Sequence, residues 1–211
     1  MPIQKISVII FFLLIFAGSS LATTGVPDPW TSFAYMPGIT NETVFLFSNP
    51  NGQGIPLNAA QIYNDGSIVD ATIVLELRDA YGSPIPHFPL EDIWLESMDG
   101  NMAPCIAGTC PDTGTDNQGI TMWTTTLRAG GYSRSGCYVM VNGMPVQQPP
   151  FALYFNSADV NGDGIVNLND LGLFATSFFH EFSYSVDFYN DGVLNLVDVG
   201  RFASAYGSAC Q

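Results

Sequence analysis

An internal repeat in the C-terminal third constrains the fold of this 211-residue chain more than any other feature. The segment from Asp159 to Phe179 aligns with the segment from Asp187 to Gly207, an offset of 28 residues. Nine of the 21 aligned residues are identical. Self-similarity at a fixed offset indicates a duplicated structural unit. The sequence therefore predicts two copies of one small unit, one after the other.

Each copy opens with the spacing of a calcium-binding loop, in which oxygen ligands come from fixed positions of about twelve residues. A glycine at position 6, Gly164 in the first copy, permits the sharp turn. Carboxylates that converge on one point repel each other unless a cation lies between them. The predicted ligands of the first loop are Asp159, Asn161, Asp163, Ile165 through its carbonyl, Asn167 and Asp170.

The second loop keeps this pattern except at position 3, where Tyr189 replaces the asparagine of the first loop. A tyrosine side chain is a poor calcium ligand, so we expect two Ca²⁺ sites with the second one weaker. The alternative for either loop is a plain turn rich in Asp and Asn. The predicted ligands of the second loop are Asp187, Asp191, Val193 through its carbonyl, Asn195 and Asp198.

Each loop is followed by apolar residues at spacings of three and four, which predicts a helix with a core-facing stripe. Before the first loop, the run Phe151–Phe155 follows two prolines and is typical of a strand rather than of an entering helix. The predicted stripes are Leu168, Leu171, Phe174 and Ala175 in the first copy, and Leu196, Val199, Phe202, Ala203 and Tyr206 in the second.

These motifs resemble the type I dockerin, a duplicated calcium module without entering helices. The resemblance covers residues 158–206 and rests on the two near-repeats and on aspartate at the last loop position, Asp170 and Asp198. It implies a module that folds on binding calcium and docks a cohesin-like module on a scaffold protein, usually in secreted polysaccharide-degrading assemblies. The residues that help to choose the cohesin in that family are here Leu168-Asn169 and Leu196-Val197, which departs from its usual small hydroxyl residues.

The N-terminal segment predicts export. A basic start ending at Lys5 precedes the apolar run Ile6–Ala17, and small residues follow up to Ala22. A run of 12 residues is too short to span a bilayer, so we expect a signal peptide over residues 1–22, no membrane anchor, and a secreted, extracellular protein.

The charge balance excludes some partners. The chain has 5 Lys and Arg against 19 Asp and Glu, a formal net charge of −14. With so few cations, we expect no binding to nucleic acid or to anionic membranes through a basic patch. The 47% of hydrophobic residues are enough for a substantial core.

The four cysteines of an exported chain predict disulfides, with three possible connectivities. Cys105 and Cys110 bracket a turn-like stretch, which favours a local bridge between them. Cys137 would then pair with Cys210.

Between Thr43 and Phe155, short apolar runs alternate with turn signals, which favours a β-sandwich. The runs Val74–Pro86 and Thr115–Trp123 resemble bacterial immunoglobulin-like domains of the invasin type, which are mostly spacers or adhesive modules. The predicted fold class is thus two-part: an immunoglobulin-like β-sandwich over residues 23–156, then a small α-helical dockerin-like module over residues 157–211.

No catalytic motif accompanies these elements, so the leading hypothesis is a non-catalytic calcium-binding interaction protein. The two histidines, His87 and His180, lie in no triad or metal-ligand spacing. The rival hypothesis is a small carbohydrate-active enzyme or glycan-binding module that the dockerin-like part would target. Its candidate acids would lie around Trp94, namely Glu91, Asp92 and Glu96.

Overall fold

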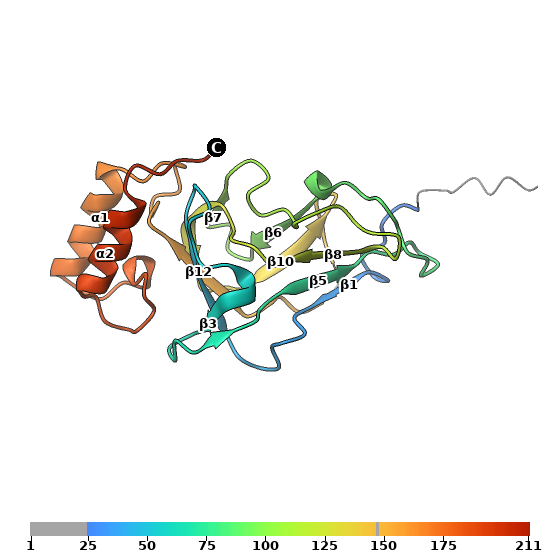
Figure 1. Ribbon diagram of the computed structural model, residues 1–211, viewed down its shortest axis with the longest axis horizontal. Coiled ribbons are helices and arrows are strands. Elements are labelled where there is room, and N and C mark those ends of the chain that lie inside the picture. Colours follow the sequence, from blue (N-terminus) through green and yellow to red (C-terminus); the bar gives the residue numbers. More distant parts are fainter. Residues whose placement is uncertain (1–24, 147) are drawn as a thin grey trace, which may run out of the picture.

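The computed structural model describes residues 25–146 and 148–211, and the predicted signal peptide lies outside them. In the described residues, twelve strands form three sheets and two α-helices follow the last strand (Figure 1). No helix in these ranges is both long enough and apolar enough to cross a membrane. Both helices lie together at one end of the molecule (Figure 1).

Two of the sheets have three strands each, in the orders β1-β5-β8 and β11-β10-β6. The third has six strands in the order β4-β3-β2-β12-β9-β7. All pairings are antiparallel except that of β2 with β12, where Val44 is paired with Leu153 and Ser48 with Ser157. The strands are β1 Phe33–Tyr35, β2 Val44–Ser48, β3 Ala60–Ile62, β4 Ile68–Val69, β5 Ile73–Glu76, β6 Ile93–Ser97, β7 Met102–Pro104, β8 Ile120–Trp123, β9 Ala129–Ser133, β10 Cys137–Val141, β11 Met144–Pro145 and β12 Leu153–Ser157.

Side chains from all three sheets meet in one apolar core. Trp123 of β8 is 1% exposed and donates its indole N–H to the carbonyl of Thr109 at 2.9 Å. It lies in the same cluster as Leu75 of β5, Leu95 of β6 and Phe155 of β12. Alternate residues of each strand face this core because successive side chains point to opposite faces of a sheet.

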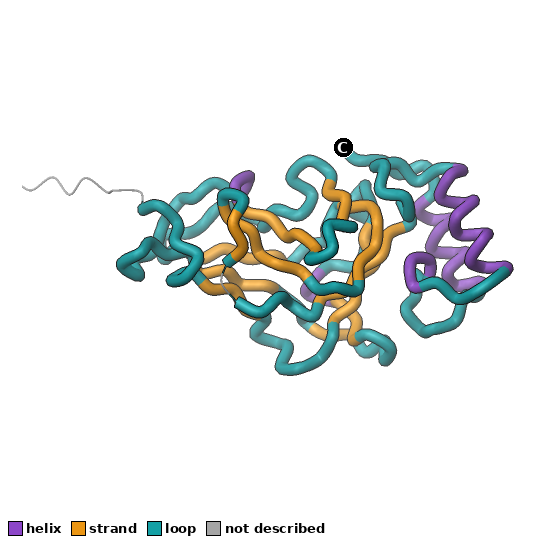
Figure 2. Tube along the Cα trace, turned by 180° about the vertical axis from the view of Figure 1, so that it is seen from behind, coloured by secondary structure: helices purple, strands orange, loops and turns teal. Residues whose placement is uncertain are grey.

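Strand β2 is buried on both faces. Val44 and Leu46 belong to the core between the sheets, whereas Phe45 and Phe47 belong to a second apolar cluster. That second cluster includes Phe174 of α1 (Leu168–Phe179) and Phe202 of α2 (Leu196–Ala205). The helices therefore cover the outer face of the six-stranded sheet, as both views of the chain show (Figures 1 and 2).

The second cluster is built largely from aromatic rings. The ring of Phe188 lies 5.5 Å from that of Phe47 and 5.8 Å from that of Phe174, centroid to centroid. Phe188 belongs to the link between the helices, which also contains the short 3-10 helix η3 (Tyr184–Val186). One aromatic layer thus joins the strand, the link and both helices.

The predicted two-part fold class is therefore wrong. Over residues 25–146 and 148–211, the protein is mostly β, with three sheets and two α-helices, and these residues contain no separate helical module. The physical reason is that Phe174 and Phe202 do not form a core by themselves. They are buried against Phe45 and Phe47 of β2, a strand that lies more than a hundred residues earlier in the chain.

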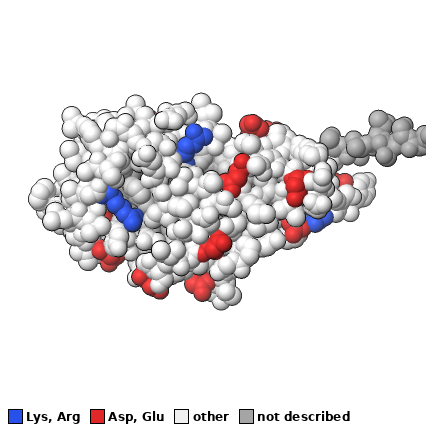
Figure 3. Space-filling model, in the orientation of Figure 1, with Lys and Arg blue, Asp and Glu red and all other residues white. Residues whose placement is uncertain are grey.

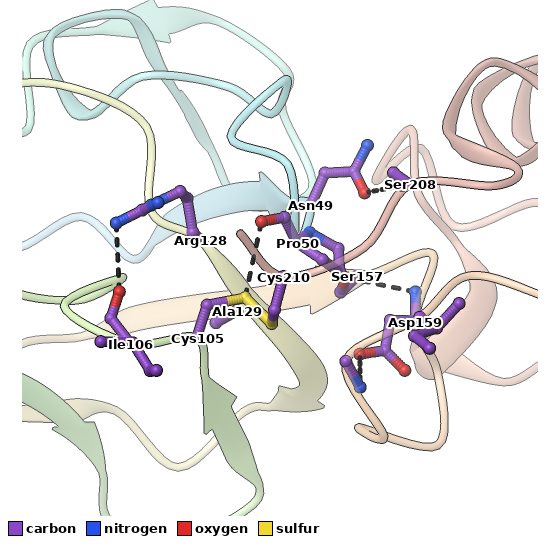
Figure 4. Close-up of a disulfide and its surroundings, with 12 residues drawn as sticks. Asn49, Pro50, Cys105, Ile106, Arg128, Ala129, Ser157, Asp159, Ser208 and Cys210 are labelled. Atoms are coloured by element: carbon purple, nitrogen blue, oxygen red, sulfur yellow. Dashed lines mark hydrogen bonds between the residues drawn. A yellow bond between two sulfur atoms is a disulfide. The ribbon is translucent and has the colours of Figure 1, made fainter.

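The predicted disulfide pairing is also wrong. Cys105 is bonded to Cys210 (Figure 4), with 5.3 Å between their Cα atoms. Cys110 and Cys137 are free thiols. The C-terminal segment runs beside the first loop, where Cys210 N–H donates to the carbonyl of Gly164 at 2.9 Å. Cys137 is fully buried in β10, and burial raises the pKa of its thiol to about 12.

Candidate metal-binding loops

The first loop folds around the carboxylate of Asp159. Backbone N–H groups of Asp163 and Gly164 donate to its two oxygens at 3.1 and 2.8 Å. Asp163 in turn accepts from the N–H of Ile165 at 3.0 Å and from the side-chain amide of Asn161 at 3.0 Å. These bonds curl residues 159–165 into a tight turn, and they bring most of the predicted ligands into one loop.

The last predicted ligand of each loop also starts the helix that follows. Asp170 accepts from the N–H groups of Asn161 and Asn167, at 3.1 and 2.9 Å, while Asn167 caps α1. Asp198 and Asn195 form the same capping box at α2. Such reciprocal bonds satisfy N–H groups that a helix start would otherwise leave without partners. The Asn and Asp residues are therefore needed by the fold as well as available to a cation.

The second loop repeats the geometry of the first. Gly192 N–H donates to Asp187 at 3.0 Å, Val193 N–H to Asp191 at 3.0 Å, and Tyr189 N–H to Asp198 at 2.9 Å. Each bond has its counterpart 28 residues earlier. The repeat seen in the sequence is thus a repeat in hydrogen bonding. The loops differ at position 3, where no bond corresponds to that of the Asn161 side chain because Tyr189 has no amide. They also differ in that Asn190 N–H donates to Asp187, whereas Asp163 N–H donates to Asp159.

The buried carboxylates of both loops form no direct ion pair with a cationic side chain of the described residues. Asp159, Asp170, Asp187 and Asp198 are at most 2% exposed. Across the described ranges, the one ion pair is Arg78 with Glu76, far from these loops in sequence. Burial raises the pKa of Asp159, and the charges of Asp170 and Asp163 raise it further, whereas the hydrogen bond from Gly164 N–H lowers it. Burial and then Asp198 likewise raise the pKa of Asp187.

The donor chemistry of both loops fits a hard cation. Every predicted ligand offers a carboxylate, amide or carbonyl oxygen, the atoms that Ca²⁺ prefers. In this part of the chain, no three His, Cys, Asp or Glu side chains gather into a ready metal cluster. The carboxylates bond to the N–H groups of their own loops instead. Calcium would have to draw in the exposed side chains of Asp163 and Asp191 toward the buried carboxylates.

The sheet holds the first residue of each loop, through two contacts that the sequence analysis did not anticipate. Gly131 N–H of β9 donates to the carbonyl of Asp159 at 2.7 Å. The side-chain amide of Asn156 in β12, fully buried, donates to the carbonyls of Asp187 at 2.6 Å and Tyr184 at 3.0 Å. A polar Asn directly after the apolar run Phe151–Phe155 was the available signal. A Cβ at the neighbouring Gly130 would overlap Asp159, so the first loop lies directly against β9.

Most of the predicted core stripes lie at the surface instead. Phe174 and Phe202 are buried, but Leu168 is 69% exposed and Leu196 is 80% exposed. The prediction failed because only one side of each helix meets the sheet. At this end of the molecule, wide uncharged areas separate a few charged groups (Figure 3). The exposed large apolar residues of the helices and their ends are Leu168, Leu171, Leu173, Phe179, Leu196, Val197, Val199 and Tyr206.

The acids of the rival enzyme hypothesis have no comparable setting. Glu91, Asp92 and Glu96 are all exposed, on the 3-10 helix η2 (Leu90–Asp92) and on β6. Glu96 accepts a hydrogen bond from the indole of Trp94 at 3.2 Å. No observation at these residues favours a hydrolytic pair.

Comparisons with known proteins give little further information. The sequence matches no family model, and no curated protein matches it. Among solved structures, the chain is similar to one titled as the crystal structure of the Lin-41 filamin domain. The two chains are 16% identical, with a TM-score of 0.30, over 61% of this chain and 95% of the other. A TM-score this low supports no conclusion about fold or function.

Proposed function

We propose that this chain is a secreted, non-catalytic protein whose two loop–helix units bind calcium and dock a cohesin-type partner. The observation that carries the calcium proposal is the pair of buried carboxylates in each loop, which have no ion-pair partner among the described residues. A buried negative charge is costly unless a cation or enough hydrogen bonds compensate it. Two Ca²⁺ ions, held by the duplicated oxygen ligands, would supply that compensation.

Calcium binding should stabilise the whole protein. At a free calcium concentration 100-fold above the dissociation constant of a site, binding at that site adds about 2.7 kcal/mol to the free energy of unfolding, or roughly 5–10 °C in melting temperature for a chain of this size. Asp163→Ala should remove most of the rise in melting temperature that comes from calcium binding at the first loop. Asp163 is exposed, so the variant should still fold without calcium. Thermal melting of the full chain in CaCl₂ and in EGTA measures both effects.

Glu181→Gln is the matched control for Asp163→Ala, because it removes one exposed acid between the two loops. It should keep the full calcium shift. Equal melting temperatures in CaCl₂ and EGTA for the unmodified protein would refute the calcium proposal.

The docking proposal is supported by the exposed apolar side chains of the helices, since large exposed apolar patches mark interaction sites. Changing Leu168 and Leu196 together to Asp should weaken binding to an immobilised cohesin module at least about tenfold, because charges at the centre of an apolar interface are not solvated. Tyr81→Asp is the control, since Tyr81 is 94% exposed in a turn between strands. Biolayer interferometry with calcium present measures all three proteins. Equal binding of the helix variant and the unmodified protein would contradict this surface.

A further inference from the structure

The two loop–helix units differ at a pair of residues that meet in space. The second unit has Tyr189 and Arg201 where the first has Asn161 and Leu173. The guanidinium carbon of Arg201 lies 4.9 Å from the centroid of the Tyr189 ring. Two changes that are distant in sequence therefore form one contact, which the first unit lacks.

Arg201 is held in place by three elements. Its side chain starts from α2, and its guanidinium lies 5.5 Å from the ring centroid of Phe47 in β2. One guanidinium N–H donates to the carbonyl of Phe188, in the second loop's entry, at 2.6 Å. A cation over two aromatic rings is stabilised by their negative faces. The charge is thus fixed beside the loop rather than mobile in solvent.

This cation lies at the entry of the second loop, because its hydrogen bond goes to the carbonyl of Phe188, the residue that follows Asp187. Burial lowers the pKa of Arg201, while Tyr189, Asp198 and Asp187 act in the opposite direction. Neither carboxylate forms a direct ion pair with the guanidinium in the described chain. Arginine stays protonated at physiological pH, so its field at the loop is permanent. In the first unit, the equivalent Leu173 supplies no charge.

We propose that Arg201 is the built-in cation of the second loop, so that this loop keeps its shape without calcium and binds calcium more weakly than the first loop. The inference rests on the proposed calcium function. The first loop has no such cation and depends on the metal to offset the repulsion among its carboxylates. Tyr189 then has a positive role: from position 3, where the first loop has the predicted ligand Asn161, its ring packs against the guanidinium.

The test uses calcium titration of the full chain by calorimetry, in the Asp163→Ala background, so that the remaining binding belongs to the second loop. Adding Arg201→Leu, which reproduces the residue of the first unit, should tighten that binding about tenfold, because it removes a positive charge that repels a divalent cation in the same loop. It should also lower the melting temperature in EGTA. Arg201→Lys, which keeps the charge, should leave the affinity close to its original value.

The reciprocal variant makes the test independent of whether Arg201→Leu folds. Leu173→Arg, at an exposed position of α1, should weaken calcium binding at the first loop in the otherwise unmodified protein. Unchanged calcium affinities in Arg201→Leu and Leu173→Arg would overturn the role of Arg201 and leave the proposed function standing. Equal effects of Arg201→Leu and Arg201→Lys would do the same. Absence of any calcium binding by the unmodified protein would overturn the proposed function, and this inference with it.

Discussion

Replacing Cys105 and Cys210 together by serine should lower the free energy of unfolding by about 4 kcal/mol. The disulfide joins residues 105 positions apart, and a bridge that closes a loop of about 100 residues strongly restricts the unfolded chain. Its loss also releases the C-terminal segment from the first loop, where Cys210 N–H donates a hydrogen bond to the carbonyl of Gly164 and Ala209 forms a β-bridge with Ile165. We therefore expect weaker calcium binding at the first loop as well. Guanidinium denaturation under non-reducing conditions measures the main effect.

Cys110→Ser is the control for the disulfide, because Cys110 is a partly exposed free thiol. It should change the free energy of unfolding by less than about 1 kcal/mol. A non-reducing peptide map should recover the cross-link between the peptides of Cys105 and Cys210. A cross-link between Cys105 and Cys110 would instead support the local pairing that the sequence suggested.

Phe47→Ala should lower the free energy of unfolding by about 3–5 kcal/mol, the usual range when a buried phenylalanine is replaced by alanine. Phe47 is 5% exposed and its ring lies against that of Phe188 and beneath the guanidinium of Arg201. The change would leave a cavity between the sheet and the helices and would remove one of the two rings around that cation. Urea denaturation, followed by fluorescence and by circular dichroism, measures the loss and shows whether the helices unfold together with the sheets.

Phe179→Ala is the matched control, because Phe179 is 78% exposed at the end of α1. Its effect should stay below about 1 kcal/mol. If Phe47→Ala unfolded the helices in a separate transition and left the sheets unchanged, the helices would be an independent module. A single transition is the outcome that the shared aromatic layer predicts.

The loops and helices were predictable because their signal is local. The spacing of Asp, Asn and Gly fixes the turns and the helix starts through bonds between near neighbours, such as Gly164 to Asp159 and Asn167 to Asp170. The strands of the middle region were predictable for the same reason: short apolar runs between turn signals predicted a series of strands between Thr43 and Phe155, where β5 is one of them. Whether the loops bind calcium stays a prediction.

The relation between the helices and the sheets was not predictable from local patterns. The run Val44–Phe47 has no alternation, a pattern typical of a strand buried on both faces, but this pattern does not identify what covers each face. The disulfide partner was even less accessible. Cys105 and Cys210 come together only because the C-terminal segment follows the first loop, an arrangement that depends on the whole fold.

The parallel pairing of β2 with β12 sets the order in which this chain can fold during synthesis. β2 emerges early, but its central partner β12 is made more than a hundred residues later. Until then, the segment Val44–Phe47 has no β12 to pair with and no helices to cover Phe45 and Phe47. Folds dominated by such distant contacts form slowly, and exposed apolar strands aggregate in the meantime. The growing chain should therefore need protection at this one segment until its last third is complete.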